Sequence, residues 1–348
     1  MSESEKSDGK VSKIDTLVAG VLAGERRGVA QAITLVETGG SAAQRIMAGL
    51  FRHTGRAHVI GITGSPGTGK STLVGAMARC YRSRDERVGI VAVDPTSPFS
   101  GGAILGDRVR MRDLVGDSGV FIRSMASRGN QGGLAAATSD AVQVLDAAGC
   151  GVIIVETVGV GQAEVDVARM AHTVVVVESP GLGDDIQALK AGLMEIADIF
   201  VVNKNDLPGA DALVSTLRSA IELASGRVEH AGHHQFEPSL DSLSPKSRAT
   251  EEVWQIPVKE TMALEREGVS DLIEAIDAHR HYTHASGMWR RRERARVEAD
   301  LLGLIKQLAV QRIMANLPVE EWTELVEAVV NRRMDPHIAV ENLWDSVL

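Results

Sequence analysis

Residues that would suit the sequence to secretion or to nucleic-acid binding are scarce. Only two cysteines are present, Cys80 and Cys150, which lie far apart and form no C-x-x-C pair. We therefore expect a thiol-reduced, cytoplasmic protein. Aromatic residues make up 3% of the chain, which leaves few rings for stacking on bases. The net charge of −9 disfavours a broad contact with duplex nucleic acid.

Long hydrophobic runs are also missing, so we expect no membrane span and no membrane partner. Residues 1–10 are polar and contain no arginine, unlike a secretory or mitochondrial leader, and we expect residues 1–12 to form a disordered tail. The hydrophobic content of 44% is ordinary for a globular protein. A length of 348 residues suggests two domains, or one large domain with appendages.

One glycine-rich stretch carries most of the information. It reads G-x-x-x-x-G-K-S, follows an apolar run and precedes apolar residues at helical spacing, which is the strand–loop–helix context of a P-loop. Backbone amides and the next helix N-terminus would bind phosphates, Lys70 would reach the β- and γ-phosphates, and Ser71 would hold Mg²⁺. The predicted phosphate-binding residues are Gly64, Ser65, Pro66, Gly67, Thr68, Gly69, Lys70, Ser71 and Thr72.

The central part of the chain, residues 57–281, alternates strand-like and helix-like segments. The strand candidates are residues 58–63, 88–93, 152–155, 173–177, 199–202 and 256–258. They are continuous β-branched runs, which is typical of strands buried on both faces. We therefore predict an α/β fold with a mostly parallel sheet, and a ligand beyond the carboxyl ends of its strands.

Helical patterns flank this region. Residues 13–56 form an N-terminal helical region that either packs on the main domain or serves as a partner-binding arm. Residues 282–348 form a C-terminal helical region with an arginine-rich start. Its apolar stripes, which include Trp322 and Trp344, suit either a dimer surface or packing against the chain's own domain.

Acidic residues follow the second and fourth strand candidates. Asp94 and Asp107 would hold Mg²⁺ or orient the attacking water, although Asp94 could instead cap a turn before Pro95. Glu156 stands where a metal-shell carboxylate is expected. Val160 occupies the position of a water-positioning glutamine and cannot polarise water, so we predict slow intrinsic hydrolysis.

Two further glycine-containing loops can each be interpreted as purely structural or as functional. Residues 125–133 suit a mobile loop beside the phosphates or a plain helix-entry turn. In residues 179–190, Asp184 or Asp185 would act as a helix N-cap, or the loop would be a nucleotide-responsive switch. A polar insertion, residues 226–250, contains three histidines; we interpret it as a solvated loop rather than a metal site.

The motif N-K-x-D follows the strand candidate at residues 199–202. The Asp206 carboxylate can accept hydrogen bonds from both N1–H and the exocyclic amine of guanine, which selects guanine over adenine. Asn203 would brace the loop, and the stem of Lys204 would lie along the base. Residues Thr261, Met262 and Ala263 complete the predicted base site, with the Ala263 amide donating to guanine O6.

These motifs together resemble the MeaB/MMAA (ArgK-type) GTPases, over roughly residues 17–348. The resemblance is carried by the P-loop, V-D-P-T-S at 93–97, S-G-G-A-I-L-G-D at 100–107, E-T-V-G-V-G-Q at 156–162 and G-D-D-I-Q-A-L-K at 183–190. It implies a P-loop G domain with helical extensions and a homodimer formed through the C-terminal helices. The resemblance further implies that the protein binds GTP and GDP with Mg²⁺. It also implies that the protein gates cofactor loading and protection of an adenosylcobalamin-dependent acyl-CoA mutase such as methylmalonyl-CoA mutase.

The resemblance also implies site roles. The catalytic positions would be Lys70, Asp94, Asp107, Glu156 and Asp184, and the metal positions Ser71, Asp94, Asp107 and Glu156. Met262 departs from the small serine usual there, which leaves the guanine affinity open. The alternatives are a metal-inserting GTPase, which the separated cysteines disfavour, a protein kinase of a transport system, and a regulatory GTPase without a mutase partner.

Overall fold

The computed structural model describes residues 3–94, 114, 116–126, 133–157, 162–181, 191–228 and 253–347. The chain divides into two compact units, Met1–Trp289 and Arg290–Leu348. Within the described residues, no helix is both long and apolar enough to cross a bilayer.

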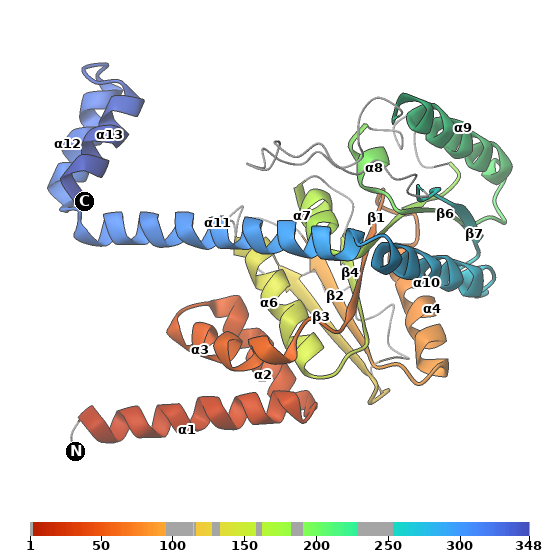
Figure 1. The fold of residues 1–348 in the computed structure, drawn as a ribbon, viewed down its shortest axis with the longest axis horizontal. Helices are drawn as coiled ribbons and strands as arrows, with labels where there is room; N and C mark the ends of the chain where they lie inside the picture. The colour runs from red at the N-terminus through yellow and green to blue at the C-terminus, as the bar shows by residue number, and fades with distance from the viewer. Residues whose placement is uncertain are drawn as a thin grey trace. The chain divides into compact units, whose positions relative to one another are not determined.

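The first unit is built on a parallel sheet of seven strands, in the order β3-β2-β4-β1-β5-β6-β7 (Figure 1). The strands are β1 His58–Thr63, β2 Val88–Asp94, β3 Val120–Ala126, β4 Val152–Thr157, β5 Thr173–Glu178, β6 Ile199–Asn203 and β7 Val258–Thr261. The prediction of an α/β fold with a mostly parallel sheet is confirmed. β1 lies at the centre, between β4 and β5.

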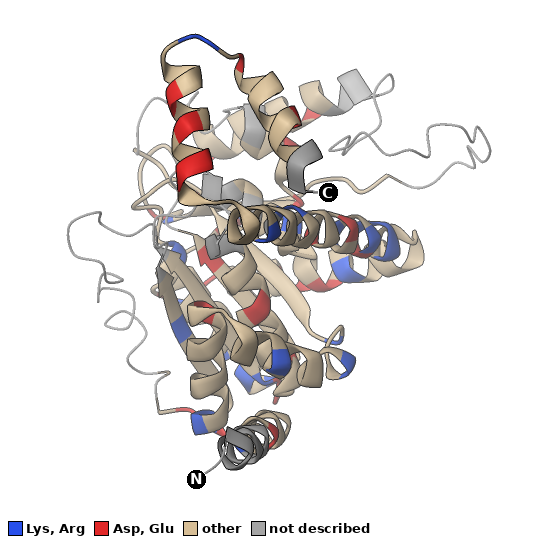
Figure 2. Ribbon diagram, turned by 90° about the vertical axis from the view of Figure 1, so that its left-hand side faces the viewer, with Lys and Arg blue, Asp and Glu red and all other residues tan. Residues whose placement is uncertain are grey.

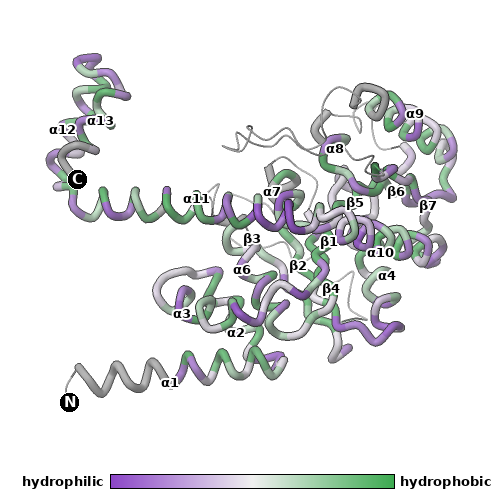
Figure 3. Tube along the Cα trace, viewed as in Figure 1, coloured by the Kyte–Doolittle hydropathy of each residue, from purple (hydrophilic) through white to green (hydrophobic). Residues whose placement is uncertain are grey.

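Helices cover both faces of the sheet because successive strand side chains point to opposite sides. In β1, Ile60 and Ile62 enter the core under α4 (Lys70–Ser83) and α10 (Val269–Ala285), whereas Val59 enters the opposite core. The helices of that second face are α6 Gly133–Ala147, α7 Gln162–Met170, α8 Ala191–Ile196 and α9 Ala210–Val228. Figure 3 shows the hydrophobic strands between these layers.

Three N-terminal helices add a further layer outside α6. They are α1 Glu3–Leu22, α2 Arg26–Thr38 and α3 Ser41–Leu50, followed by the short 3-10 helix η1 Phe51–His53. Their buried residues share one core with α6. Glu37 of α2 pairs with Arg123 of β3. The helix α1 begins at Glu3, within the segment expected to be a tail.

Two strand predictions need correction. β3 is absent from the strand candidates because Arg123 and Ser124 interrupt its apolar pattern. Its place at the edge of the sheet explains this composition, since Arg123 reaches Glu37 of the N-terminal layer. The last strand, predicted at 256–258, spans Val258–Thr261 instead. Its polar Lys259 and Glu260 are half-buried, as befits the opposite edge.

The second unit consists of helices. α11 (Met288–Asn316) begins at the end of the first unit, and α12 (Val319–Val330) and α13 (Pro336–Val347) follow. A basic turn, Arg332 and Arg333, joins α12 to α13, and acidic residues line α12 (Figure 2). Large apolar side chains of this unit are exposed, including Leu301, Leu304, Ile305, Leu308, Val310, Trp322, Val330 and Trp344.

Candidate nucleotide-binding site

The predicted site lies where the carboxyl ends of the central strands meet. β1 ends at Thr63 and leads into the loop 64–69, β4 ends in Glu156 and Thr157, and β6 ends at Asn203. Because these strands are parallel and close in the sheet order, their loops gather at one edge. The structure therefore brings the P-loop, the Glu156 segment and the N-K-x-D motif together.

The P-loop backbone needs glycine at two positions. Gly64 has φ +131°, and a Cβ there would lie 2.0 Å from the Val177 carbonyl oxygen of β5. Gly69 has φ +89°, and a Cβ there would meet the Asn203 side-chain nitrogen at 2.5 Å. Both are left-handed conformations that only glycine adopts without strain. The loop is thus packed directly on β5 and on the base-recognition motif.

Lys70 is held inside the loop that precedes it. Its Nζ donates to the carbonyl oxygens of Gly64 at 2.7 Å and Ser65 at 2.8 Å. The side chain is 5% exposed, so the ammonium is buried at the entry to α4. A cation beside the first amides of a helix creates a positive site, which is the electrostatic requirement for binding phosphate.

Ser71 and Glu156 converge on one another across the site. Ser71 Oγ donates to Glu156 Oε1 at 2.6 Å, and both residues are buried. The hydroxyl comes from the first turn of α4 and the carboxylate from the end of β4. Two oxygen donors in contact are the ligand type that Mg²⁺ prefers, so these residues fit the predicted metal role.

A second contact connects the same region of β4 to β1, and the sequence motifs did not predict it. Thr157 Oγ1 donates to Thr63 Oγ1 at 3.1 Å, with both side chains fully buried. The bond joins the strand before the P-loop to the strand that carries Glu156. The contact follows from the register in which β1 pairs with β4. The sequence alone does not predict it, because threonine in a strand indicates only a preference for β-structure.

Asn203 connects the phosphate and base ends of the site. Its Nδ2 donates to the Thr68 carbonyl oxygen at 2.8 Å, and its Oδ1 accepts from Thr261 Oγ1 at 3.0 Å and from the Ala263 amide at 3.2 Å. The predicted bracing role of Asn203 takes this form. The Ala263 amide, assigned to guanine O6 above, donates here to Asn203, so its contact with the base stays a prediction.

Lys204 and Asp206 lie on the turn after β6. Lys204 has φ +60°, and its Nζ donates to the Gly67 carbonyl oxygen at 2.8 Å, which draws the side-chain stem along the P-loop. The Leu207 amide closes the turn on the Lys204 carbonyl oxygen at 3.0 Å. Asp206 is exposed on this turn, where a ligand can reach its carboxylate.

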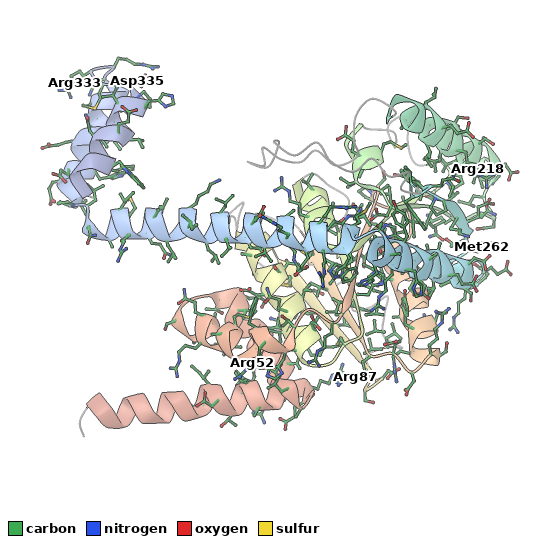
Figure 4. The ribbon with its side chains drawn as sticks, viewed as in Figure 1. Arg52, Arg87, Arg218, Met262, Arg333 and Asp335 are labelled. Atoms are coloured by element: carbon green, nitrogen blue, oxygen red, sulfur yellow. The ribbon has the colours of Figure 1, made fainter. Side chains whose placement is uncertain are left out.

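The loop after β7 has a fixed shape. Met262 and Glu267 exchange two backbone hydrogen bonds, of 3.1 and 3.2 Å, which close the turn between them. Gly268, at φ +71°, packs so close to the Glu260 carbonyl that a Cβ would lie 2.0 Å from its oxygen. Met262 is half-buried on this loop (Figure 4). The backbone hydrogen bonds between Met262 and Glu267 thus fix the position from which the Met262 side chain extends.

Several predicted residues lie outside the description. Asp107, Val160 and Asp184 fall in residues that the structure does not describe. Asp94 is the last residue of β2, which lies next to β4, but its side chain is not described. The same holds for most of the loops at 125–133 and 179–190 and for most of the histidine-bearing insertion.

A parallel sheet with a P-loop after its central strand and N-K-x-D after β6 defines a P-loop GTPase. The family described as methylmalonyl Co-A mutase-associated GTPase MeaB matches residues 29–318, and the chain belongs to this family.

Relatives and a solved structure agree with this assignment. A Pyrococcus abyssi protein is 43% identical over 335 residues, covering 96% of this chain and 97% of the relative. GTPase ArgK of Escherichia coli is 34% identical, with 93% of each chain covered. The mouse methylmalonic aciduria type A homolog is 30% identical over 93% of this chain and 77% of its own. The crystal structure of an LAO/AO transport system kinase has a TM-score of 0.67 at 25% identity, covering 97% and 98%.

Proposed function

We propose that this GTPase acts as a chaperone of an adenosylcobalamin-dependent acyl-CoA mutase, methylmalonyl-CoA mutase or a close relative. In this role GTP binding and hydrolysis gate cofactor loading and protect the mutase. The single observation behind the proposal is the family match over residues 29–318, whose description names the mutase. The similarity to the mouse methylmalonic aciduria type A homolog supports the same partner.

The described residues support a division of labour within the site. Lys70, held on the P-loop carbonyls, would neutralise the charge of the β- and γ-phosphates. Ser71 and Glu156 would hold Mg²⁺, with Asp94 and Asp107 as further candidates. A bound Mg²⁺ would neutralise phosphate charge as the γ-phosphate leaves. Asp206 would select GTP and GDP through the guanine edge.

Hydrolysis by the chain alone is proposed to be slow. Val160 carries no group that can orient water, so another residue must do so. Asp184, in the proposed switch loop, is our candidate for a residue that the mutase recruits. The rate should therefore rise when the mutase binds.

A homodimer through the C-terminal helices is part of this proposal. α12 buries none of its residues within the chain, and Trp322, Val326 and Val330 are 40–66% exposed. Leu301, Leu304, Ile305 and Leu308 of α11 are similarly open. Apolar surface of this extent suits an interface between two copies. The unpaired cysteines support the proposed cytoplasmic location.

Two of the alternative functions, a metal-inserting GTPase and a protein kinase, receive less support. A metal-inserting GTPase needs a Cys/His cluster, and the described part of the chain contains no group of three or more potential metal ligands. A protein kinase needs a phosphoacceptor. The name of the similar LAO/AO transport system kinase is the argument for that reaction, and the described residues add none.

The decisive experiment is capture of the mutase. The purified full chain, loaded with a non-hydrolysable GTP analogue or with GDP, is mixed with the cobalamin-dependent mutase subunits of the same source and analysed by size exclusion. We expect a co-eluting mutase and a hydrolysis rate that rises on mixing. Asp206→Asn, which should bind the guanine nucleotide more weakly, is the control. A nucleotide-loaded protein that neither binds nor responds to any such mutase would contradict the proposal.

A further inference from the structure

A second polar cluster lies at the opposite end of the sheet from the nucleotide site. It is built at the amino ends of three neighbouring strands, from His58 of β1, Thr173 of β5, Asp198 just before β6 and His279 of α10. His58, Thr173 and His279 are at most 1% exposed, and Asp198 is 4% exposed. None of these residues belongs to the nucleotide site.

The four side chains form one continuous chain of contacts. His279 Nε2 lies 3.2 Å from Asp198 Oδ1, His279 Nδ1 lies 2.9 Å from Thr173 Oγ1, and that hydroxyl lies 2.9 Å from His58 Nε2. The order carboxylate, imidazole, hydroxyl also occurs in hydrolytic triads. Here the hydroxyl is fully buried, so no substrate can reach it and the cluster has no catalytic use.

The Thr173 hydroxyl links the two imidazoles of this cluster. When the Thr173 hydroxyl donates to His279 Nδ1, its oxygen can accept from His58 Nε2–H. His279 Nε2 faces Asp198 Oδ1 at ion-pair distance and makes no hydrogen bond within the described residues. Burial and the neighbouring His172, Arg280, His279 and His284 lower the pKa of His58 well below its usual value.

His172 is fixed beside this chain by its own backbone and by β1. Its Nδ1 accepts the Val59 amide at 2.9 Å, and its backbone amide returns a bond of 2.8 Å to the Val59 carbonyl oxygen. An imidazole nitrogen that accepts a backbone N–H carries no proton, so this ring is neutral in the described conformation. The ring is also buried, at 8% exposure for the residue.

Trp289 completes the arrangement. It lies in the first turn of α11 and is the last residue of the first unit. Its indole stacks on His172, with ring centroids 3.7 Å apart, and on His284 of α10, with centroids 4.2 Å apart. The two interplanar angles are 23° and 20°. The start of α11 is therefore anchored on two imidazoles.

We propose that His172 and His284 form a proton-sensitive latch that holds Trp289, and with it the first turn of α11, against the base of the sheet. A proton added at His172 Nδ1 would face the Val59 amide, two donors in opposition, and would place a charge in a buried position. The charge could gain attraction from the indole face. The lost acceptor and the burial of charge outweigh that gain, so the ring must turn and the stack opens.

The surrounding charges act in the same direction. Among the described residues, the titratable and charged groups around the latch include His58, Asp198, His279, Arg280, His281 and His284. Apart from Asp198, which His279 engages, all are cationic or become so in acid. Burial, with Arg280 and His281, lowers the pKa of His284. The latch is therefore closed at neutral pH, and acid opens it.

The test uses Trp289 as its own reporter. Phenylalanine replaces Trp254, Trp322 and Trp344 in the full chain, and acrylamide quenching of the remaining fluorescence is followed from about pH 8 to about pH 5. We expect quenching to increase with a midpoint below the usual histidine pKa of about 6.5, before any loss of far-UV circular dichroism. His172→Gln with His284→Gln should abolish this transition. His337→Gln, at an exposed position of α13 outside the cluster, should leave it unchanged.

A measurement on the unsubstituted protein keeps the inference open to refutation if the reporter variant does not fold. Hydrogen exchange of the peptide around residues 286–292, corrected for the intrinsic rate, should be faster at about pH 5.5 than at about pH 7.5. Quenching and exchange that stay constant, or a transition that survives the paired histidine substitutions, would overturn the latch.

Discussion

At the scale of single residues, Asn203 shows how one side chain can organise a site. It bonds the P-loop through the Thr68 carbonyl and the base loop through Thr261 and Ala263. The phosphate and guanine ends of the nucleotide site are therefore not independent. A substitution that displaces either loop should therefore also change the position of the other.

Asp206 supplies the sharpest test of base selection. In Asp206→Asn one carboxylate oxygen becomes an amide donor, which opposes the N1–H or amine of guanine. GTP affinity should fall by roughly 1–3 kcal/mol. The same amide can donate to the C2 carbonyl of xanthine, so XTP should bind better than to the wild type. Calorimetric titration with both nucleotides measures this, with Asp211→Asn as the control. Equal affinity of the wild type for ATP and GTP would refute the assignment.

His58 predicts how stability depends on pH. Its pKa in the folded protein lies well below that of the unfolded chain, about 6.5. Above that value both states are neutral and the group contributes no pH dependence. Below it the unfolded state binds the extra proton, so the free energy of unfolding falls with acid, by up to about 1.4 kcal/mol per pH unit.

Urea denaturation at several pH values checks this expectation. His58→Gln can still bond Thr173 but cannot titrate, so its stability should fall less steeply in acid than that of the wild type. His281→Gln, which replaces an exposed histidine, should keep the wild-type slope. An identical slope for His58→Gln and the wild type would show that other groups carry the acid sensitivity.

At the scale of elements, Asp146 of α6 shapes the entry to β1. Its carboxylate accepts the amides of Gly55 at 2.5 Å and Ala57 at 3.1 Å, and also bonds the Arg56 amide. Asp146→Ala leaves these amides without their acceptor and should lower stability by about 1–3 kcal/mol. Glu222→Ala, at an exposed position of α9, should change it by less than about 0.5 kcal/mol. Thermal unfolding compares the two; equal effects would contradict the role of Asp146.

The proposed switch loop gives a kinetic prediction. Asp184→Ala should leave GTP affinity nearly intact, because an N-cap contributes only about 1 kcal/mol of local stability. It should remove most of the hydrolysis that the mutase stimulates. Turnover with and without mutase, beside a binding titration, separates the two effects, and Asp185→Ala is the neighbouring control. Full stimulation in Asp184→Ala would reduce this carboxylate to a helix cap.

The strands differ in how well the sequence alone predicts them. Strands such as β1, β4 and β5 are buried on both faces and read as uninterrupted apolar runs. β3 was not predicted because Arg123, which forms an ion pair with Glu37, interrupts the apolar pattern of this edge strand. The site residues were predicted through motifs of fixed spacing. The cluster around His58 was not, because its members lie far apart in the sequence and only the sheet order joins them.

At the scale of the whole molecule, the exposed apolar residues of the C-terminal helices predict a dimer. Light scattering after size exclusion should give twice the mass of the chain. Leu301→Glu with Leu308→Glu, which places charge on α11, should give the monomer. Leu223→Glu changes an equally open leucine of α9 and should leave the dimer intact. A wild-type monomer at micromolar concentration would contradict the interface.

The central position of β1 has a consequence for how the chain acquires its structure. Among the described strands β1 comes first in the chain, and its partners β4 and β5 are synthesised only after β2 and β3. Until then a largely apolar strand with two unpaired edges stays exposed in the nascent chain. Such long-range parallel pairing forms slowly and favours aggregation. Yield in a heterologous host should thus depend on slow translation, low temperature and chaperones that shield this one hexapeptide.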